Sequence, residues 1–149
     1  MIWGSISAKG KLELIMVKGS MKSCDYQEIL TQFFKGKVNK YYPNNTYFFQ
    51  HDNAPPHVSK SSINFLKKHR IDYLNWPANS PDMNPVENCW KLLSSEVYKN
   101  GKIFSNKASL WNSIQRAWDS LDDNIVKNLC LSFEKRLNMC LEKEGKWIP

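Results

Sequence analysis

The stretch that decides the fold is TYFFQHDNAPPHVSKSSINFLKKHRIDYLNW, residues 46–76. Its first part, 46–52, is rich in β-forming residues and lies between asparagines and prolines, which predicts a short central strand buried on both faces. Residues 58–69 suit a helix, with one face made of Val58, Ser62, Phe65, Leu66 and His69. Residues 71–76 indicate a second strand. This strand, helix and strand order predicts a parallel pair joined by a right-handed crossover.

The sequence before this unit predicts a hairpin and a helix. Residues 2–7 and 11–19 are typical of two strands joined by a turn that contains Gly10. Ser23 is a candidate cap for a helix whose apolar positions recur at helical spacing: Tyr26, Ile29, Leu30, Phe33 and Phe34. The whole chain therefore favours an α/β fold, with helices packed on a mixed sheet.

The segment WPANSPDMNPVENCW, residues 76–90, predicts a stiff lead into another helix. Asn84 suits the N-cap, Pro85 the first helical position, and Glu87 the third residue after the cap, where a carboxylate closes a capping box. One apolar stripe follows: Val86, Trp90, Leu93 and Val97. On this simplest interpretation Glu87 is a capping residue and nothing more.

Two more helices are predicted in the last third of the chain. The first follows Ser105 and has an apolar face of Leu110, Trp111, Ile114 and Trp118. The second starts at Asp122, closes at Gly145 and has an apolar face of Ile125, Leu129, Phe133 and Leu137. We expect Trp90, Trp111 and Trp118 to be core residues, because all three lie on such stripes.

Composition limits the classes of function. A chain of 149 residues with 42% apolar content fits one globular domain, and its net charge of +7 is compatible with a polyanionic partner. The four cysteines show no metal-binding or disulfide spacing, which favours a reducing compartment. No signal-peptide pattern and no apolar run of membrane-spanning length occurs, so we expect a soluble protein without a membrane partner.

Two acids are candidates for a metal site. Asp52 ends the predicted central strand, and Glu87 follows the neighbouring predicted strand, so one sheet edge could present both carboxylates. Carboxylates are preferred ligands of Mg²⁺ and Mn²⁺, and a metal pair about 3.5–4 Å apart supports phosphodiester cleavage. The alternative is an ordinary turn residue at Asp52 and a helix cap at Glu87. The pattern alone leaves both interpretations open.

Two ordered motifs resemble a known family. QHDNAPPH, residues 50–57, and WPANSPDMNPVENCW, with thirty-four residues between Asp52 and Glu87, closely resemble the catalytic domain of Tc-mariner transposases in the DDE superfamily. WGSIS at residues 3–7 and the helical tail are similar to the same family. The resemblance implies a ribonuclease-H-like fold and Mg²⁺- or Mn²⁺-dependent cleavage and strand transfer of transposon ends. It also implies TA target sites and a nuclear location. A homodimer is a candidate assembly, and the sequence leaves the oligomeric state open.

The resemblance assigns the family's second catalytic acid to Asp52 and its third to Glu87. The family's first acid lies on a strand well upstream of the WG motif, and neither Asp25 nor Asp82 matches that position. We therefore expect residues 1–149 to form one partial catalytic domain, without its first central strand and its amino-terminal DNA-binding region. We expect such a chain to be inactive alone. The alternative is a non-catalytic DNA-binding or dimerising module.

Further candidates flank Asp52. Asn53 could orient Asp52 or a metal-bound water, or could simply favour a turn. His57 is spaced from His51 in a way that could hint at a metal site, but a hydrogen-bonding role near Asp52 is favoured. The basic residues that border the predicted helix could contact DNA phosphates or form a solvated face: Lys60, Lys67, Lys68 and Arg70.

Overall fold

The computed structural model describes residues 1–146 and contains two compact units. Unit 1 consists of Met1 and Val17–Ser80, and unit 2 consists of Ile2–Met16 and the chain from Pro81 onward. The four cysteines are free thiols. Over the described range, every helix is too short or too polar to cross a bilayer. Each unit has its own core and is described separately below.

Unit 2 begins with the predicted hairpin, which the structure confirms. Strands β1 (Ile2–Ser7) and β2 (Gly10–Met16) pair antiparallel, and the register shifts between Ser5 and Ile6. Gly10 adopts φ +105°, and a Cβ atom there would come within 2.6 Å of the Asp123 carboxylate. The turn therefore requires glycine for both its backbone conformation and its close approach.

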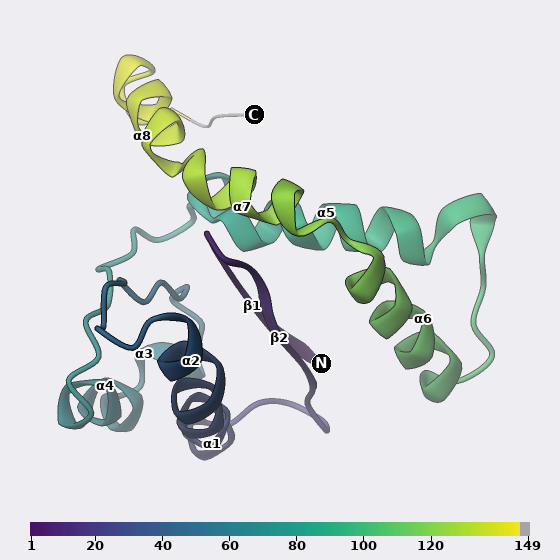
Figure 1. Ribbon diagram of the computed structural model, residues 1–149, viewed down its shortest axis with the longest axis horizontal. Helices are drawn as coiled ribbons and strands as arrows, with labels where there is room; N and C mark the ends of the chain where they lie inside the picture. The colour runs from purple at the N-terminus through teal and green to yellow at the C-terminus, as the bar shows by residue number, and fades with distance from the viewer. Residues whose placement is uncertain (147–149) are drawn as a thin grey trace. The chain divides into compact units, whose positions relative to one another are not determined.

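Up to residue 146, unit 2 also contains four α-helices, of which α5 and α7 lie against the hairpin (Figure 1). They are α5 (Pro85–Val97), α6 (Lys107–Ser120), α7 (Asp123–Leu131) and α8 (Phe133–Glu142), with short turns η2 (Pro81–Met83) and η3 (Lys99–Gly101). Their shared core consists of Cys89, Leu93, Val97, Ile114, Ala117, Trp118 and Val126. Trp90 packs beside this core and occupies the space that a Cβ on Gly4 would need, 2.5 Å away. The glycine of the WGSIS motif thus allows strand and helix to approach closely.

Most predicted helices of unit 2 are confirmed, with corrections at their ends. The helix predicted after Ser105 is confirmed as α6, and Asn106 caps it, because its Oδ1 accepts the Ser109 N–H at 2.8 Å. The helix predicted from Asp122 onward is wrong as one continuous element, because it divides at Ser132 into α7 and α8. Its predicted stripe is also partly wrong: Val126 is fully buried, whereas Ile125 is exposed.

Unit 1 is built around α1 (Ser23–Phe33), which packs against α3 (Pro55–Val58) and α4 (Lys60–Lys68). The π-turn η1 (Phe34–Val38) and α2 (Asn39–Tyr41) continue α1. The predicted apolar positions of α1 are buried: Tyr26, Ile29, Leu30, Phe33 and Phe34. The predicted Ser23 cap is wrong. Lys22 is the N-cap, and its N–H donates to the Asp25 carboxylate at 2.8 Å.

The two strands predicted in residues 46–52 and 71–76 reduce to one parallel bridge between Phe49 and Tyr73. The Phe49 N–H donates to Asp72 at 2.8 Å, and the Leu74 N–H donates to Phe49 at 2.9 Å. The parallel direction is confirmed, but burial on both faces is wrong, because Phe48 is 72% exposed. The ring of Phe49 packs on Phe34 of η1 instead of a second sheet face.

The connection between these segments is helical, as predicted, but it starts differently. A Pro-Pro turn forms α3, and Ser59 then caps α4 by accepting the Ser62 N–H at 3.2 Å. Val58 therefore lies outside the long helix and is exposed, which corrects its predicted place on the buried face. Ser62 and Leu66 are the fully buried residues of α4.

Candidate metal-binding carboxylates

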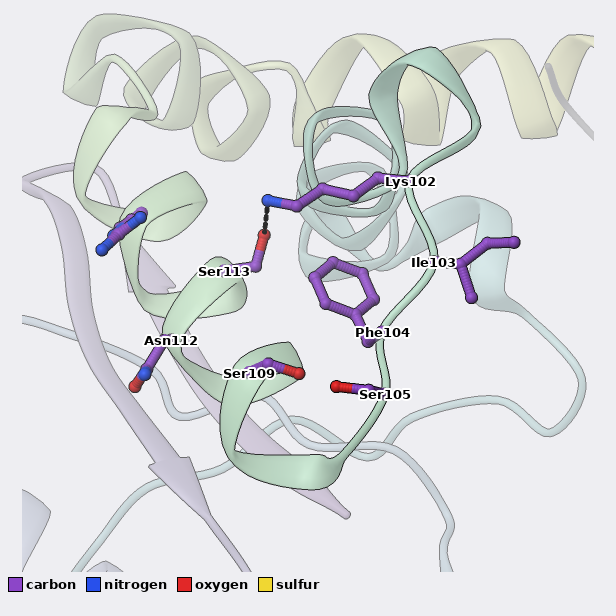
Figure 2. Close-up of a pocket in the computed structure, with 8 residues that line it drawn as sticks. Lys102, Ile103, Phe104, Ser105, Ser109, Asn112 and Ser113 are labelled. Carbon is purple, nitrogen blue, oxygen red and sulfur yellow. Dashed lines mark hydrogen bonds between the residues drawn. The ribbon is translucent and has the colours of Figure 1, made fainter.

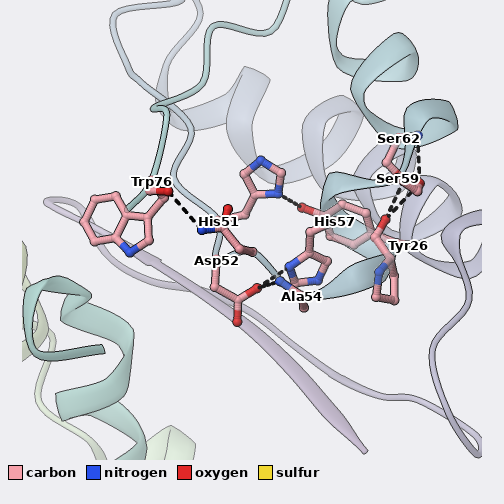
Figure 3. A network of polar contacts seen from close by, with 10 residues as sticks. Tyr26, His51, Asp52, Ala54, His57, Ser59, Ser62 and Trp76 are labelled. Carbon is pink, nitrogen blue, oxygen red and sulfur yellow. Dashed lines mark hydrogen bonds and ion pairs between the residues drawn. The ribbon is translucent and has the colours of Figure 1, made fainter. Parts of the chain in front are cut away.

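Asp52 lies in the loop between the Phe49 bridge and α3, and one of its two carboxylate oxygens is fixed (Figure 3). Oδ1 accepts the Ala54 N–H at 3.0 Å and the His57 Nδ1–H at 2.6 Å. Oδ2 accepts no hydrogen bond from residues 1–146, and the side chain is 53% exposed. One oxygen thus sets the orientation, and the other is available to a ligand.

The same contacts keep Asp52 ionised. The hydrogen bond from His57 is the largest cause that lowers the pKa of the Asp52 carboxyl below its usual value. Partial burial opposes this shift, and the hydrogen bond from the Ala54 N–H adds to it. An anionic carboxylate at neutral pH is the form that a divalent cation binds.

His57 is itself supported by a buried aromatic and histidine cluster. Its ring packs on Tyr26 at a centroid distance of 4.1 Å, and the Tyr26 hydroxyl lies 3.1 Å from His51 Nδ1 (Figure 3). Burial raises the pKa of Tyr26 and lowers the pKa of His51 to about 4, so both groups are neutral at pH 7. The tyrosine O–H can then donate to the imidazole nitrogen.

Tyr26 is the site residue that sequence reasoning missed. Its helical spacing predicted a plain core position, and it is indeed fully buried. The spacing of apolar residues carries no information on the hydroxyl, whose partner lies twenty-five residues further along the chain. A tyrosine among the apolar residues of a predicted core stripe was the available signal, because a buried hydroxyl requires a partner.

Asn53 makes a different contact from the one expected. Its Nδ2 donates to the Trp76 carbonyl at 2.9 Å (Figure 3). This bond fastens the Asp52 loop to the segment that carries the parallel bridge. Asn53 therefore fixes the backbone on which Asp52 stands, without a hydrogen bond to the carboxylate itself.

Glu87 lies in unit 2, in the first turn of α5, where the predicted N-cap is confirmed. Asn84 Oδ1 accepts the Val86 N–H at 3.3 Å, and Pro85 occupies the first helical position. The Asn84 N–H donates to the Pro81 carbonyl at 3.1 Å. In a capping box this N–H would donate to the Glu87 carboxylate instead. Among the described residues, the half-buried Glu87 carboxylate accepts no hydrogen bond. The helix start thus leaves it free for another partner.

The donor chemistry of both acids suits a hard divalent cation. Mg²⁺ binds through one or two carboxylates and completes its shell with waters and phosphate oxygens. Asp52 has one carboxylate oxygen, and Glu87 has two, that accept no hydrogen bond from residues 1–146. No group of three or more His, Cys, Asp or Glu side chains placed to hold a metal ion occurs within residues 1–146. Asp25 accepts the Lys22 N–H at the start of α1, and Asp82 lies in η2.

The four predicted DNA-contact residues belong to α4 and its carboxyl end. Lys60, Lys67, Lys68 and Arg70 are all exposed. Arg70 adopts φ +53°, the left-handed conformation that commonly ends a helix, and its N–H donates to the Lys67 carbonyl at 3.1 Å. The structure therefore gives Arg70 a backbone role in ending α4 and leaves all four side chains accessible.

Comparison with known proteins gives concordant matches. A family model described as DDE superfamily endonuclease matches residues 1–111. The Tc3 transposase of Caenorhabditis elegans is 41% identical over 148 residues, which cover 99% of this chain and 45% of that protein. The chain spans about half the length of the curated relatives it matches.

Solved structures match over nearly the whole chain. The Mos1 transposase catalytic domain, determined with raltegravir and Mg, is 19% identical with a TM-score of 0.83, covering 99% of this chain and 75% of that one. A Mos1 paired-end complex with the left transposon end gives a TM-score of 0.84 at 19% identity, covering 99% and 44%. The match supports the expected ribonuclease-H-like fold.

Proposed function

Because the chain belongs to the DDE superfamily of endonucleases, in its Tc-mariner transposase group, we propose that it contributes to cleavage and strand transfer of transposon DNA. The observation that carries this proposal is the geometry of Asp52. Its Oδ1 is held by His57 and Ala54 within the family motif, and its Oδ2 accepts no hydrogen bond from residues 1–146. Such an arrangement suits a metal ligand that must keep one orientation.

Asp52 and Glu87 are the residues that would hold Mg²⁺ or Mn²⁺. When bound as a pair, these metal ions would polarise the scissile phosphate and lower the pKa of an attacking water. The contribution of the chain is to present the Asp52 carboxylate, ionised and in a fixed orientation, and to place Glu87 at a capped helix start. His57 holds the Asp52 carboxylate, Asn53 holds its loop, and the capped start of α5 holds Glu87.

We also propose that these 149 residues do not cleave DNA alone. The family motif, carried over residue by residue, fills two of its three acidic positions in this chain. Two carboxylates bind divalent metal more weakly than three, because each ligand adds to the binding free energy. A non-catalytic role in DNA binding or dimerisation is the second candidate function, favoured by the basic, exposed side chains of α4.

Binding of Mn²⁺, followed by electron paramagnetic resonance, tests the ligand assignment. We expect Asp52→Asn and Glu87→Gln each to weaken Mn²⁺ binding by roughly tenfold or more. Glu134→Gln, an exposed acid of α8, should leave it unchanged. Equal binding by all four proteins would contradict the assignment.

A nicking assay on duplex DNA tests the inactivity of the chain. We expect no robust Mg²⁺- or Mn²⁺-dependent cleavage by the 149-residue chain. Robust cleavage that Glu87→Gln abolishes would overturn this expectation and establish the enzyme. DNA binding without metal binding would instead favour the non-catalytic module.

The remaining family properties are proposals of the same kind. We propose that the partner is duplex DNA with transposon ends and TA targets, that two copies act together, and that the protein works in the nucleus. Lys60, Lys67, Lys68 and Arg70 are proposed phosphate contacts, because exposed cations attract the DNA backbone. Sedimentation of the chain with and without duplex DNA would measure the oligomeric state.

A further inference from the structure

A second basic site occurs in unit 2, away from both acids in the sequence. It is the α6 groove, lined by Lys102, Phe104, Ser109, Asn112, Ser113 and Arg116 (Figure 2). The loop after η3 forms one wall, and one face of α6 forms the other. The groove has a volume of about 330 Å³, which is small for a drug-sized ligand and ample for one phosphodiester group.

The cations of the groove are available to an external anion. Lys102 Nζ donates to Ser113 Oγ at 3.3 Å and lies 5.2 Å from the centre of the Phe104 ring, so its position is fixed without an acidic partner. Arg116 follows Ser113 by three residues on α6 and makes no ion pair with any residue of 1–146. No acidic side chain lines the groove along the described chain.

The neutral residues of the groove complete an anion-binding set. Ser113 presents a hydroxyl group and Asn112 an amide on α6, whereas the Ser109 hydroxyl already donates to the Asn106 carbonyl at 2.8 Å. Hydroxyl and amide groups are common donors to phosphate oxygens, and exposed Lys and Arg supply the charge. A mixed set of this kind binds the backbone of a nucleic acid without reading its bases.

We propose that the α6 groove binds the phosphodiester backbone of duplex DNA, independently of metal. The choice of DNA as the anion rests on the proposed function of the chain. The groove would add a contact to the strand at a site separate in sequence from the α4 cations. Binding here should be insensitive to DNA sequence and strongly dependent on salt.

Fluorescence anisotropy with labelled duplex DNA, in EDTA and between 50 and 200 mM salt, tests the groove. The double variant Lys102→Ala, Arg116→Ala should lower the slope of log affinity against log salt by about 2, since each lost phosphate contact removes about 0.9. The matched control, Lys91→Ala with Lys127→Ala, removes the same charge from exposed positions outside the groove. Equal changes in the two double variants would overturn the proposal.

A single substitution separates the effect of the position of Lys102 from the effect of its charge. Ser113→Ala keeps the net charge and removes the hydroxyl that holds Lys102, so DNA affinity should fall less than in the double variant but measurably. Far-UV circular dichroism checks that each variant is folded. Competition by polyglutamate as effective as competition by DNA would assign the groove to an acidic protein partner and overturn the DNA proposal.

The outcome is separable from that of the proposed function. Asp52→Asn should lose Mn²⁺ binding and keep metal-free DNA affinity. Unchanged DNA affinity in the groove variant, with intact Asp52-dependent Mn²⁺ binding, would reject the groove alone. If the groove variant loses DNA affinity and Asp52→Asn leaves Mn²⁺ binding unchanged, only the metal assignment is rejected.

Discussion

Asp52 and Glu87 are held by different kinds of structure. Asp52 stands on a loop, and a network of polar contacts through Ala54, His57 and Tyr26 sets its position. Glu87 stands on a helix whose start is capped by Asn84 and whose later turns enter an apolar core. The first acid depends on a few directional hydrogen bonds, whereas the second depends on collective packing. Substitutions should therefore perturb the two acids by separate routes.

The core under α5 should give the largest effect. Leu93 is 5% exposed and belongs to the shared core of unit 2. Leu93→Ala should lower the free energy of unfolding by about 2–5 kcal/mol, because it removes buried methyl groups and leaves a cavity. Urea denaturation measures this loss. Leu92→Ala, on the same helix at 41% exposure, is the control and should cost much less.

The polar cluster beneath Asp52 should respond to pH. The pKa of His51 is about 4 in the folded chain and 6.5 when unperturbed, so between these values only the unfolded chain binds the extra proton. The stability that His51 contributes is full above pH 6.5 and falls as the pH drops toward 4. We expect a loss of about 1–2 kcal/mol, below the full linkage value because the ring is only partly buried.

Metal-free urea titrations at several pH values measure this dependence. His51→Gln should flatten the slope of unfolding free energy between pH 6.5 and 4, because the titrating group is gone. An unchanged slope in the variant would assign the pH dependence to other groups and would remove His51 from the network that supports Asp52.

The helical part of the fold was predictable because its causes are local. Asn84 and Pro85 predict the start of α5, and the apolar stripe that contains Leu93 and Val97 predicts its buried face. Long-range contacts were less accessible to sequence reasoning. The apolar run at 46–52 predicted a central strand, but its rings pack on η1 and its ladder consists of a single bridge, Phe49 with Tyr73.

The two proposed metal ligands came from the sequence, whereas the residues that hold them in place did not. Asp52 and Glu87 were proposed from their places after two predicted strands and in the family motifs. The hydrogen-bond partners of the Asn53 amide and the Tyr26 hydroxyl lie twenty-three and twenty-five residues away in the sequence. Hydrogen-bond partners at such separations follow from the tertiary fold, so neither periodicity nor propensity could supply them.

Tyr26→Phe tests whether the hydroxyl matters apart from the ring. The variant keeps the ring against His57 and loses the hydrogen bond to His51, which leaves a buried imidazole nitrogen without its partner. We expect a loss of about 1 kcal/mol in unfolding free energy by urea denaturation. Tyr41→Phe, at an exposed position, is the matched control and should be neutral. Identical stability of both variants would reduce Tyr26 to a packing residue.

The smallest effect on stability, and the sharpest on Asp52, should come from His57→Phe. The ring contact with Tyr26 is kept, but the Nδ1–H that donates to Asp52 Oδ1 is lost. Unfolding free energy should fall by at most about 1 kcal/mol, since the exposed carboxylate is rehydrated. The pKa of Asp52 should rise toward its usual value, measured by carbon-detected NMR titration, because the largest cause of its lowering is removed. An unchanged Asp52 titration in the variant would show that the hydrogen bond from His57 does not set this pKa.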